Sequence, residues 1–182
     1  MRREEKTEEK NMEGTLVALC ASERRGVKKE PRDSGYLERG RGLRGDGHAQ
    51  GGPRQVSLLM RESIERMRRR GASVGYGDFA ENLVTGGVDL GRVRVGDRIR
   101  VGNAQLRVTM IGKECHSPCS IYRQVGFCIM PAEGVFCSVE RPGHVRVGDP
   151  VILASEGEDG PPLEPDTGVE TGHGDGPSRW SR

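Results

Sequence analysis

The sequence predicts a mainly β protein with one or two helices, folded as a barrel or a sandwich. Short apolar runs recur along the chain between Gly-containing turns, and only one stretch has helical periodicity. Gly accounts for 28 of 182 residues, roughly twice its usual share of about 7%. Hydrophobic residues make up 33% and aromatic residues 4% of the chain, which implies a small core of Val, Leu and Ile.

Six short apolar segments are expected to form strands: residues 15–21, 55–59, 98–101, 105–111, 135–139 and 150–153. Gly102 and Asn103 separate two of these segments and suit the tight turn of a hairpin. Residues 22–55 are rich in Gly and charge and have few apolar side chains. We interpret them as a long connection, and connections of this length are usually functional or disordered.

One helix is expected over residues 61–70. Met60, Ile64 and Met67 recur at helical spacing and form a single apolar stripe. Acidic residues lie near the start of this segment and arginines at its end, which suits the helix dipole. Gly71 follows directly, as is typical of a helix C-terminus.

The two ends of the chain differ in composition from the middle. Residues 1–12 alternate in charge and contain almost nothing apolar, so we expect a disordered leader. Residues 155–182 are rich in Gly and Pro and have a net charge of −5, which predicts a disordered acidic tail. The whole chain has a net charge of +2, so the remainder carries +7. Residues 13–154 are expected to form a single domain.

Composition also disfavours several classes of protein. No stretch approaches the ~18 apolar residues of a membrane-spanning helix, and the first ten residues lack the apolar region of a secretion signal. The five cysteines are an odd number and, without such a signal, are typical of reduced thiols in a cytoplasmic protein. Aromatic residues that stack on bases are few, so we expect neither a nucleic acid nor a membrane as a partner.

The segment around Cys115 offers a reactive thiol. Lys113 and Cys115 lie two residues apart, so both side chains point the same way if the chain is extended. A lysine ammonium favours the thiolate, which is the nucleophilic and metal-binding form of cysteine. His116 adds a second positive or ligating group. From the residues alone, a loop cysteine with incidental neighbours explains the segment equally well.

A structural zinc site is another interpretation of this region. Five candidate ligands fall within 23 residues: Cys115, His116, Cys119, Cys128 and Cys137. Cys115 and Cys119 have the spacing of one zinc knuckle, but Cys128 and Cys137 do not form a second. Cys20, Cys128 and Cys137 stand among apolar residues, where cysteine is usually a small buried hydrophobic side chain.

Two further loops have polar residues that suit a ligand. Closely spaced glycines over residues 45–52 allow backbone N–H groups to approach an anion, and His48 and Arg54 supply charge. A flexible surface loop is the alternative, and no Lys-Ser/Thr follows to make a P-loop. Glu81 and Asn82 either orient a ligand or satisfy the backbone groups of a turn.

Seven short motifs follow one another in an order that resembles a known family: GDGHA (45–49), RQVSL (54–58), GDFAENL (77–83), VGD (95–97), IGKECH (111–116), CIMPAEGVF (128–136) and GD (148–149). In this order the chain resembles the MOSC domain, named after the C-terminal domain of molybdenum cofactor sulfurases, in its small stand-alone form. The resemblance runs from about Gly14 to Leu153 and implies a MOSC-type β-barrel.

The resemblance implies a role in molybdenum cofactor metabolism, either binding this anionic pterin dithiolene or carrying sulfur. The family's key cysteine corresponds to Cys115, as persulfide acceptor or molybdenum ligand. The implied cofactor-binding positions are Asp46, His48, Arg54, Glu81, Asn82, Lys113 and His116, with Arg54 and Lys113 for the phosphate. Relatives usually have the sequence His-Ala-Gly at this point, whereas this chain has Gln50 in place of the Gly. The larger side chain affects how closely the backbone of this loop can approach a ligand.

Several functions are compatible with this resemblance. The domain either accepts sulfur in a sulfurtransferase-type reaction or, with an electron donor, reduces N-hydroxylated substrates at molybdenum. We find no room for the pyridoxal-phosphate domain of full sulfurases, so the expected partner is a cysteine desulfurase or a molybdenum cofactor biosynthesis or acceptor enzyme. The alternatives are a non-catalytic adaptor that docks on such an enzyme through the acidic tail, and a Cys/His structural zinc protein.

Overall fold

The structure is a computed structural model that describes residues 12–114 and 118–154. Its strands are β1 (Glu13–Ala21), β2 (Glu30–Arg32), β3 (Ser34–Glu38), β4 (Gly42–Leu43), β5 (Val56–Met60), β6 (Leu83–Gly86), β7 (Arg98–Val101), β8 (Ala104–Ile111), β9 (Val135–Arg141), β10 (Gly143–Arg146) and β11 (Pro150–Ala154). Its helices are α2 (Arg61–Arg69), α3 (Ser120–Val125), α4 (Met130–Glu133) and the 3-10 turn η1 (Leu90–Arg92). The expected acidic tail, and all of the expected leader but Met12, lie outside the described residues.

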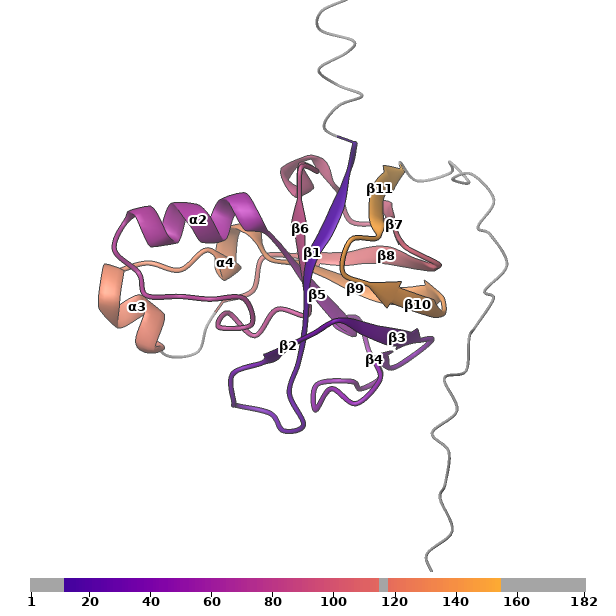
Figure 1. The fold of residues 1–182 in the computed structure, drawn as a ribbon, viewed down its shortest axis with the longest axis horizontal. Coiled ribbons are helices and arrows are strands. Elements are labelled where there is room, and N and C mark those ends of the chain that lie inside the picture. Colours follow the sequence, from indigo (N-terminus) through magenta and orange to yellow (C-terminus); the bar gives the residue numbers. More distant parts are fainter. Residues whose placement is uncertain (1–11, 115–117, 155–182) are drawn as a thin grey trace, which may run out of the picture.

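A seven-stranded barrel forms the body of the domain (Figure 1). Its strands run in the order β11-β7-β8-β9-β5-β6-β1, and antiparallel pairing of β1 with β11 closes the ring. Neighbouring strands are antiparallel except β5 and β6, which are parallel because α2 connects them. The mainly β, barrel-type fold predicted from the sequence is therefore confirmed.

Side chains from all seven strands fill the barrel interior. The fully buried members include Leu16, Leu58, Leu83, Ile99, Leu106, Val135 and Val151. A second apolar cluster lies between the barrel wall and α2, α3 and α4, and contains Leu59, Ile64, Met67, Val84 and Phe136. Successive residues of a strand point to opposite faces, so β5 is buried on both, with Leu58 inside the barrel and Leu59 under the helices. This double burial explains its continuous apolar sequence.

The region expected as a long connection contains strands. Within residues 22–55, β2 pairs with β1, and β3 joins β4 and the distant β10 in a small second sheet. These strands are short and mostly exposed or half-buried, so they lack the apolar run by which a strand is usually recognised. The interpretation of this region as an unstructured connection was therefore wrong.

The helical content is slightly greater than the sequence predicts. The expected helix is present as α2, with Ile64 and Met67 fully buried and arginines in its last turn. The short helices α3 and α4 were not expected, since each is too short for helical periodicity to show. Among the described residues, none of these helices is long and apolar enough to cross a bilayer.

Replacing Ile64 by Ala tests how far the packing of α2 stabilises the barrel. Because Ile64 is fully buried, the cavity left by Ile64→Ala is expected to lower the free energy of unfolding by about 2–5 kcal/mol. Urea unfolding followed by circular dichroism measures this change. Arg69→Ala on the exposed side of α2 is the control, with an expected change within about 0.5 kcal/mol. Equal effects of the two substitutions would contradict the packing of α2 described above.

Candidate functional site

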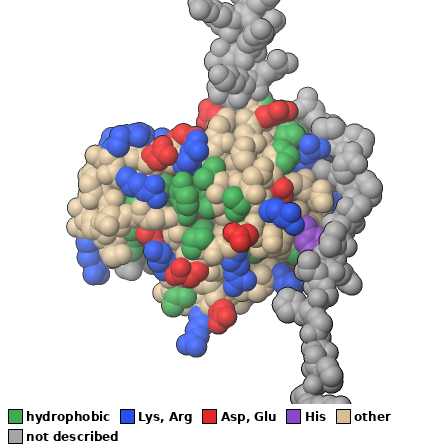
Figure 2. Space-filling model, viewed as in Figure 1, with side chains coloured by type: hydrophobic (Ala, Val, Ile, Leu, Met, Phe, Trp, Pro, Cys, Tyr) green, Lys and Arg blue, Asp and Glu red, His purple; other side chains and the backbone are tan. Residues whose placement is uncertain are grey.

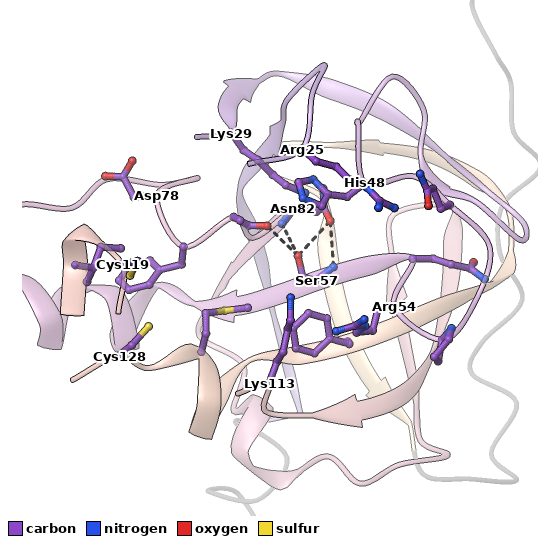
Figure 3. A pocket seen from close by; sticks show the side chains of 18 of the residues that line it. Arg25, Lys29, His48, Arg54, Ser57, Asp78, Asn82, Lys113, Cys119 and Cys128 are labelled. Atoms are coloured by element: carbon purple, nitrogen blue, oxygen red, sulfur yellow. Dashed lines mark hydrogen bonds between the residues drawn. The ribbon is translucent and has the colours of Figure 1, made fainter. Parts of the chain in front are cut away.

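A pocket of about 700 Å³ opens on the side of the barrel where several loops meet (Figure 3). Its walls come from the β1–β2 and β4–β5 loops, β5, the segment before β6, the segment after β8, and the α3–α4 region. The lining residues are Arg25, Lys29, His48, Gln50, Gly51, Pro53, Arg54, Gln55, Ser57, Asp78, Phe79, Ala80, Asn82, Lys113, Cys119, Ile121, Cys128, Met130 and Phe136.

The charge of this lining is strongly one-sided. Four basic side chains line the pocket (Arg25, Lys29, Arg54 and Lys113), of which Lys29 is paired with Asp46 behind the lining, whereas Asp78 is the only acidic side chain among the described lining residues. Asp78 is itself paired with Lys28, at 2.7 Å between Oδ1 and Nζ. On the face shown in Figure 2, by contrast, basic and acidic side chains are interspersed. The pocket lining is therefore more one-sided in charge than the face shown in Figure 2.

A buried ion pair forms part of the pocket wall. Lys29 is 1% exposed, and its Nζ donates to Asp46 Oδ2 at 2.7 Å. Asp46 Oδ1 accepts from the Ser22 backbone N–H at 3.0 Å, and Asn82 Nδ2 donates to Oδ2 at 3.0 Å. Burial alone would raise the pKa of Asp46, but these donors outweigh it and hold the pKa below its usual range. Burial lowers the pKa of Lys29, and the adjacent Asp46 carboxylate opposes that change.

Asn82 connects this ion pair to the barrel. Its Oδ1 accepts from the backbone N–H of Ser57 at 3.1 Å and from Ser57 Oγ at 3.2 Å, and its Nδ2 also donates to the Cys20 carbonyl at 3.2 Å. Asn82 is 2% exposed, so an unsatisfied amide here would be costly. One side chain thus joins β1, β5, β6 and the loop that carries Asp46.

Glu81 holds the neighbouring loop from behind the pocket. It is fully buried, and its two carboxylate oxygens accept from the backbone N–H groups of Gly77 at 2.6 Å and Phe79 at 3.1 Å. Gly77 has a φ of +90°, and a Cβ there would lie 2.0 Å from the Lys29 carbonyl oxygen, so only Gly fits. Ala80 also adopts a left-handed φ of 62°. The carboxylate therefore stabilises a strained loop that the pocket uses as a wall.

His48 lines the pocket and has one ring nitrogen without a partner in the described part of the chain. Its Nδ1 is buried and has no hydrogen-bond partner among the described residues. Burial, together with the nearby Lys29 charge, lowers the pKa of His48, so the ring is neutral near pH 7. A neutral imidazole can accept a hydrogen bond at one ring nitrogen and donate at the other.

The segment that follows β8 is fixed by backbone contacts to α4. The Gly112 N–H donates to the Gly134 carbonyl at 2.6 Å, and the Lys113 N–H donates to the Met130 carbonyl at 3.2 Å. α4 is held to α2 by the ion pair between Arg66 and Glu133, at 2.6 Å. The position of Lys113 on the pocket wall therefore depends on packing that reaches back to α2.

The structure brings together most of the site residues predicted from the sequence. His48, Arg54, Asn82 and Lys113 line the pocket, and Asp46 lies directly behind Lys29 and Asn82. Glu81 does not line the pocket, since both of its oxygens are turned to the loop backbone. Cys115 and His116 lie outside the described residues.

Sequence reasoning missed Arg25, Lys29 and Ser57 as lining residues, and it named Cys119 and Cys128 only as candidate zinc ligands. Lys29 stands in a run of charged residues that gives no sign of its burial. Cys20 and Cys137 are fully buried, as expected, whereas Cys128 is half-buried and faces the pocket. The only signal in the sequence was the presence of several cysteines in this region. Their spacing does not show that Cys119 and Cys128 both line the pocket.

The zinc interpretation finds no support in the described part of the chain. Among residues 12–114 and 118–154, no three His, Cys, Asp or Glu side chains are grouped so that they could hold a metal ion. Because Cys115 and His116 fall outside this range, a zinc site that includes them stays a prediction.

Comparison with known proteins places the fold in a family. The model of the MOSC domain matches residues 45–152, more than half of the chain. The chain belongs to the MOSC domain family. This family is associated with functions related to the molybdenum cofactor.

Solved structures share this MOSC fold at low sequence identity. The YuaD protein from Bacillus subtilis has a TM-score of 0.67 and 20% identity, over 79% of this chain and 97% of that chain. YiiM from Escherichia coli has a TM-score of 0.57 and 24% identity, over 80% of this chain and 72% of that one. YiiM from Geobacillus stearothermophilus has a TM-score of 0.57 and 18% identity, over 78% and 75%. No curated protein sequence matches the chain significantly.

Asp46→Asn tests the buried ion pair. The substitution leaves the Lys29 ammonium buried without a counter-charge, so we expect the free energy of unfolding at pH 7 to fall by about 3–5 kcal/mol. Adding Lys29→Met to Asp46→Asn removes the unpaired charge and is expected to restore part of the loss. Urea unfolding of the three proteins measures both effects. A double variant no more stable than Asp46→Asn would contradict this explanation.

The pH dependence of stability tests the burial of Glu81. Burial raises the pKa of Glu81 to about 7 from its ordinary value of 4.5. The folded protein therefore binds a proton that the unfolded chain releases, and this contribution to the free energy of unfolding falls as the pH rises from about 4.5 to about 7. The urea midpoint of the wild type is expected to fall with rising pH across this range because of Glu81. In Glu81→Gln this contribution to the pH dependence is expected to be absent. The exposed Glu114→Gln is the control, and parallel curves for wild type and Glu81→Gln would refute the prediction.

Proposed function

We propose that this MOSC domain binds the molybdenum cofactor in the described pocket, with Cys115 as the thiolate that meets the molybdenum or its sulfur. The observation that carries the proposal is the composition of the pocket: three basic side chains besides the ion-paired Lys29, an imidazole nitrogen without a hydrogen-bond partner among the described residues, and two cysteine side chains around one cavity. An anionic pterin with a phosphate at one end and soft sulfur at the other needs both kinds of group.

The pocket fits this group in size as well as in chemistry. Its volume of about 700 Å³ lies within the range of about 300–1,000 Å³ typical of small-molecule sites. In Figure 3 Cys119 and Cys128 lie at one end of the pocket, whereas Arg25, His48 and Arg54 lie at the other. Phe79, Ile121, Met130 and Phe136 provide apolar surface against which a planar ring system packs.

Each part of the chain has a distinct task in this proposal. Arg54 and Lys113 hold the phosphate through charge-assisted hydrogen bonds, and the buried Lys29, whose charge is balanced by Asp46, forms part of the pocket wall. His48 Nδ1 accepts a hydrogen bond from the pterin. Once bound, the cofactor supplies a dithiolene-held molybdenum centre that is open to a soft ligand or to sulfur. Cys115 follows Lys113 by two residues and is therefore the thiol that we assign to that centre.

The other candidate functions receive less support. Four cations around the pocket oppose a divalent zinc ion there, whereas they favour an anionic ligand. The adaptor function depends on the acidic tail, which lies outside the described residues. A cysteine desulfurase as sulfur donor and a cytoplasmic location remain predictions.

Purification from a host that makes the cofactor tests the proposal. We expect wild-type protein to carry molybdenum together with a pterin, measured per chain by elemental analysis and by fluorescence of the released, oxidised pterin. Arg54→Ala and Lys113→Ala each remove a phosphate contact worth about 1.5–3 kcal/mol, so pterin affinity is expected to fall roughly 10- to 100-fold. Cys115→Ser is expected to keep the pterin and lose the molybdenum.

The exposed Arg69→Ala on α2 is the matched control, because it removes an equal charge away from the pocket. Stoichiometric zinc without pterin in the wild type would overturn the proposal in favour of a zinc site. Equal pterin content in all the arginine and lysine variants would show that the pocket is not where the pterin binds.

A further inference from the structure

Three arginines stand on the outer face of β7 and β8, outside the pocket lining. Side chains alternate along a strand, so Arg98 and Arg100 point away from the barrel interior that Ile99 fills. Arg107 does the same on β8, where it lies directly across from Arg98. Figure 1 shows β7 on the side of the barrel away from α2 and α3. Like charges directly opposite one another on neighbouring strands repel, so this arrangement is costly without anions nearby.

Glu140 of β9 offsets only part of this charge. Its carboxylate pairs with Arg98 at 2.9 Å between Oε2 and Nε, and with Arg107 at 3.4 Å between Oε1 and Nη1. Burial alone would raise the pKa of Glu140, but hydrogen bonds and charge from these two arginines outweigh it and hold the pKa below its usual range. Glu140 is the only acidic residue of β7, β8 and β9. These three strands therefore have a net positive charge.

The chain leaves the barrel beside this face. Ala154, the last residue of β11, pairs with Arg98 of β7, and neighbouring strands lie about 4.8 Å apart. The first acidic residues that follow are Glu156, Glu158 and Asp159. Because a chain spans at most about 3.5 Å per residue, all three stay within about 18 Å of Ala154. Their carboxylates can therefore reach the arginines of β7 and β8 without a long connection.

Charge distinguishes the C-terminal segment from the other end of the chain. Residues 155–182 contain seven acidic and two basic side chains, which gives a net charge of −5. Residues 1–11 start from the neighbouring strand, because β1 pairs with β11, but their four basic side chains balance their four acidic ones. Of the two segments that adjoin this part of the barrel, only residues 155–182 are therefore complementary in charge to the arginines.

We propose that the acidic segment 155–182 binds back onto the outer face of β7 and β8 of its own barrel, with its first carboxylates paired to Arg98, Arg100 and Arg107. Each ion pair on a surface is weak and is screened by salt. A short covalent connection, however, raises the effective concentration of the segment at this face to about the millimolar range. Several weak pairs within one chain are therefore favoured over the same pairs with a separate acidic molecule.

The contact would change what this part of the surface attracts. An excess of arginine on an open face attracts polyanions without specificity, and a bound acidic segment neutralises that charge. The pocket stays open, since no residue of β7 or β8 lines it. An enzyme that binds the domain through residues 155–182 would first have to displace them from the barrel.

Carbodiimide crosslinking of the full chain tests the contact, because this reagent joins an amine to a carboxylate that touches it. Strands β7, β8 and β9 contain no lysine, and Arg100→Lys adds an amine there while it keeps the charge. We expect a crosslink from position 100 to residues 155–182 at about 0.01 M salt. It is expected to disappear at about 1 M salt, where the Debye length falls from about 30 Å to about 3 Å. The exposed Arg69→Lys on α2 is the matched control, with roughly tenfold less of this crosslink expected.

Mass spectrometry of tryptic peptides locates the crosslink. Cleavage after Arg98, Arg107, Arg146 and Arg179 places position 100 in peptide 99–107 and the acidic residues of the segment in peptide 147–179. Fragmentation then identifies which carboxylate of the second peptide has reacted. An equimolar mixture of unlabelled and isotopically labelled protein distinguishes a contact within one chain from a contact between two copies. Crosslinks that join labelled to unlabelled peptides would overturn the inference in favour of a second copy.

A charge variant tests the same contact without a new amine. The combined substitutions Glu156→Gln, Glu158→Gln and Asp159→Asn remove the carboxylates nearest to the face. We expect a lower urea midpoint at low salt, because less negative charge then offsets the repulsion between the arginines, and no such change at about 1 M salt.

The matched control for this variant removes the same charge from the other end of the chain, through Glu4→Gln, Glu5→Gln and Glu8→Gln. This control is expected to keep the urea midpoint of the wild type. Equal midpoints of the two variants, or equal crosslinking from positions 69 and 100, would overturn the inference. Neither measurement involves the pterin, so both outcomes are independent of the proposed function.

Discussion

The contact between Lys29 and Asp46 joins segments that are far apart in the sequence. Asp46 receives Lys29 and the Ser22 backbone from the β1–β2 connection, and Asn82 from the start of β6. Through Asn82 the same carboxylate is connected to Ser57 on β5. Three loops that form the pocket therefore have a common attachment point. Proteins in which a buried ion pair is replaced by apolar side chains are often as stable as the original or more stable. A contribution to stability therefore does not by itself explain why a lysine is buried in the pocket wall.

The pocket combines a rigid wall and groups of opposite chemical character. Hydrogen bonds from Asn82 and Glu81 fix the loop from Gly77 to Asn82, and α4 fixes the segment that leads to Lys113. The side chain of Lys29 and the backbone of Lys113 are thus held in place before any ligand arrives, which lowers the ordering cost of binding. The thiols of Cys119 and Cys128 stand at the other end, before and after the six-residue helix α3. A basic end and a thiol end suit a ligand that has an anionic group at one end and a soft centre at the other.

The sequence predicts six of the seven barrel strands because each has an apolar run bounded by turn residues, as Gly102 and Asn103 bound the β7–β8 hairpin. It does not predict β3, whose partner β10 lies over a hundred residues away and whose side chains are mostly half-buried. The site was predicted where motifs mark it, as at His48 and Asn82. The burial of Lys29 and the inward turn of Cys128 depend on tertiary contacts with no local signal. Glu81 was predicted as a cofactor-binding position, but its carboxylate accepts hydrogen bonds from the loop backbone and does not line the pocket.

Closure of the barrel by β1 and β11 also fixes where the domain connects to other polypeptide. The Leu153 N–H donates to the Met12 carbonyl at 2.9 Å, so the first and last described strands begin and end side by side (Figure 1). The pocket is built entirely from segments between these two strands. The domain can therefore be inserted into a surface loop of another protein, or circularly permuted with a short linker, without rerouting any of the segments that form the pocket.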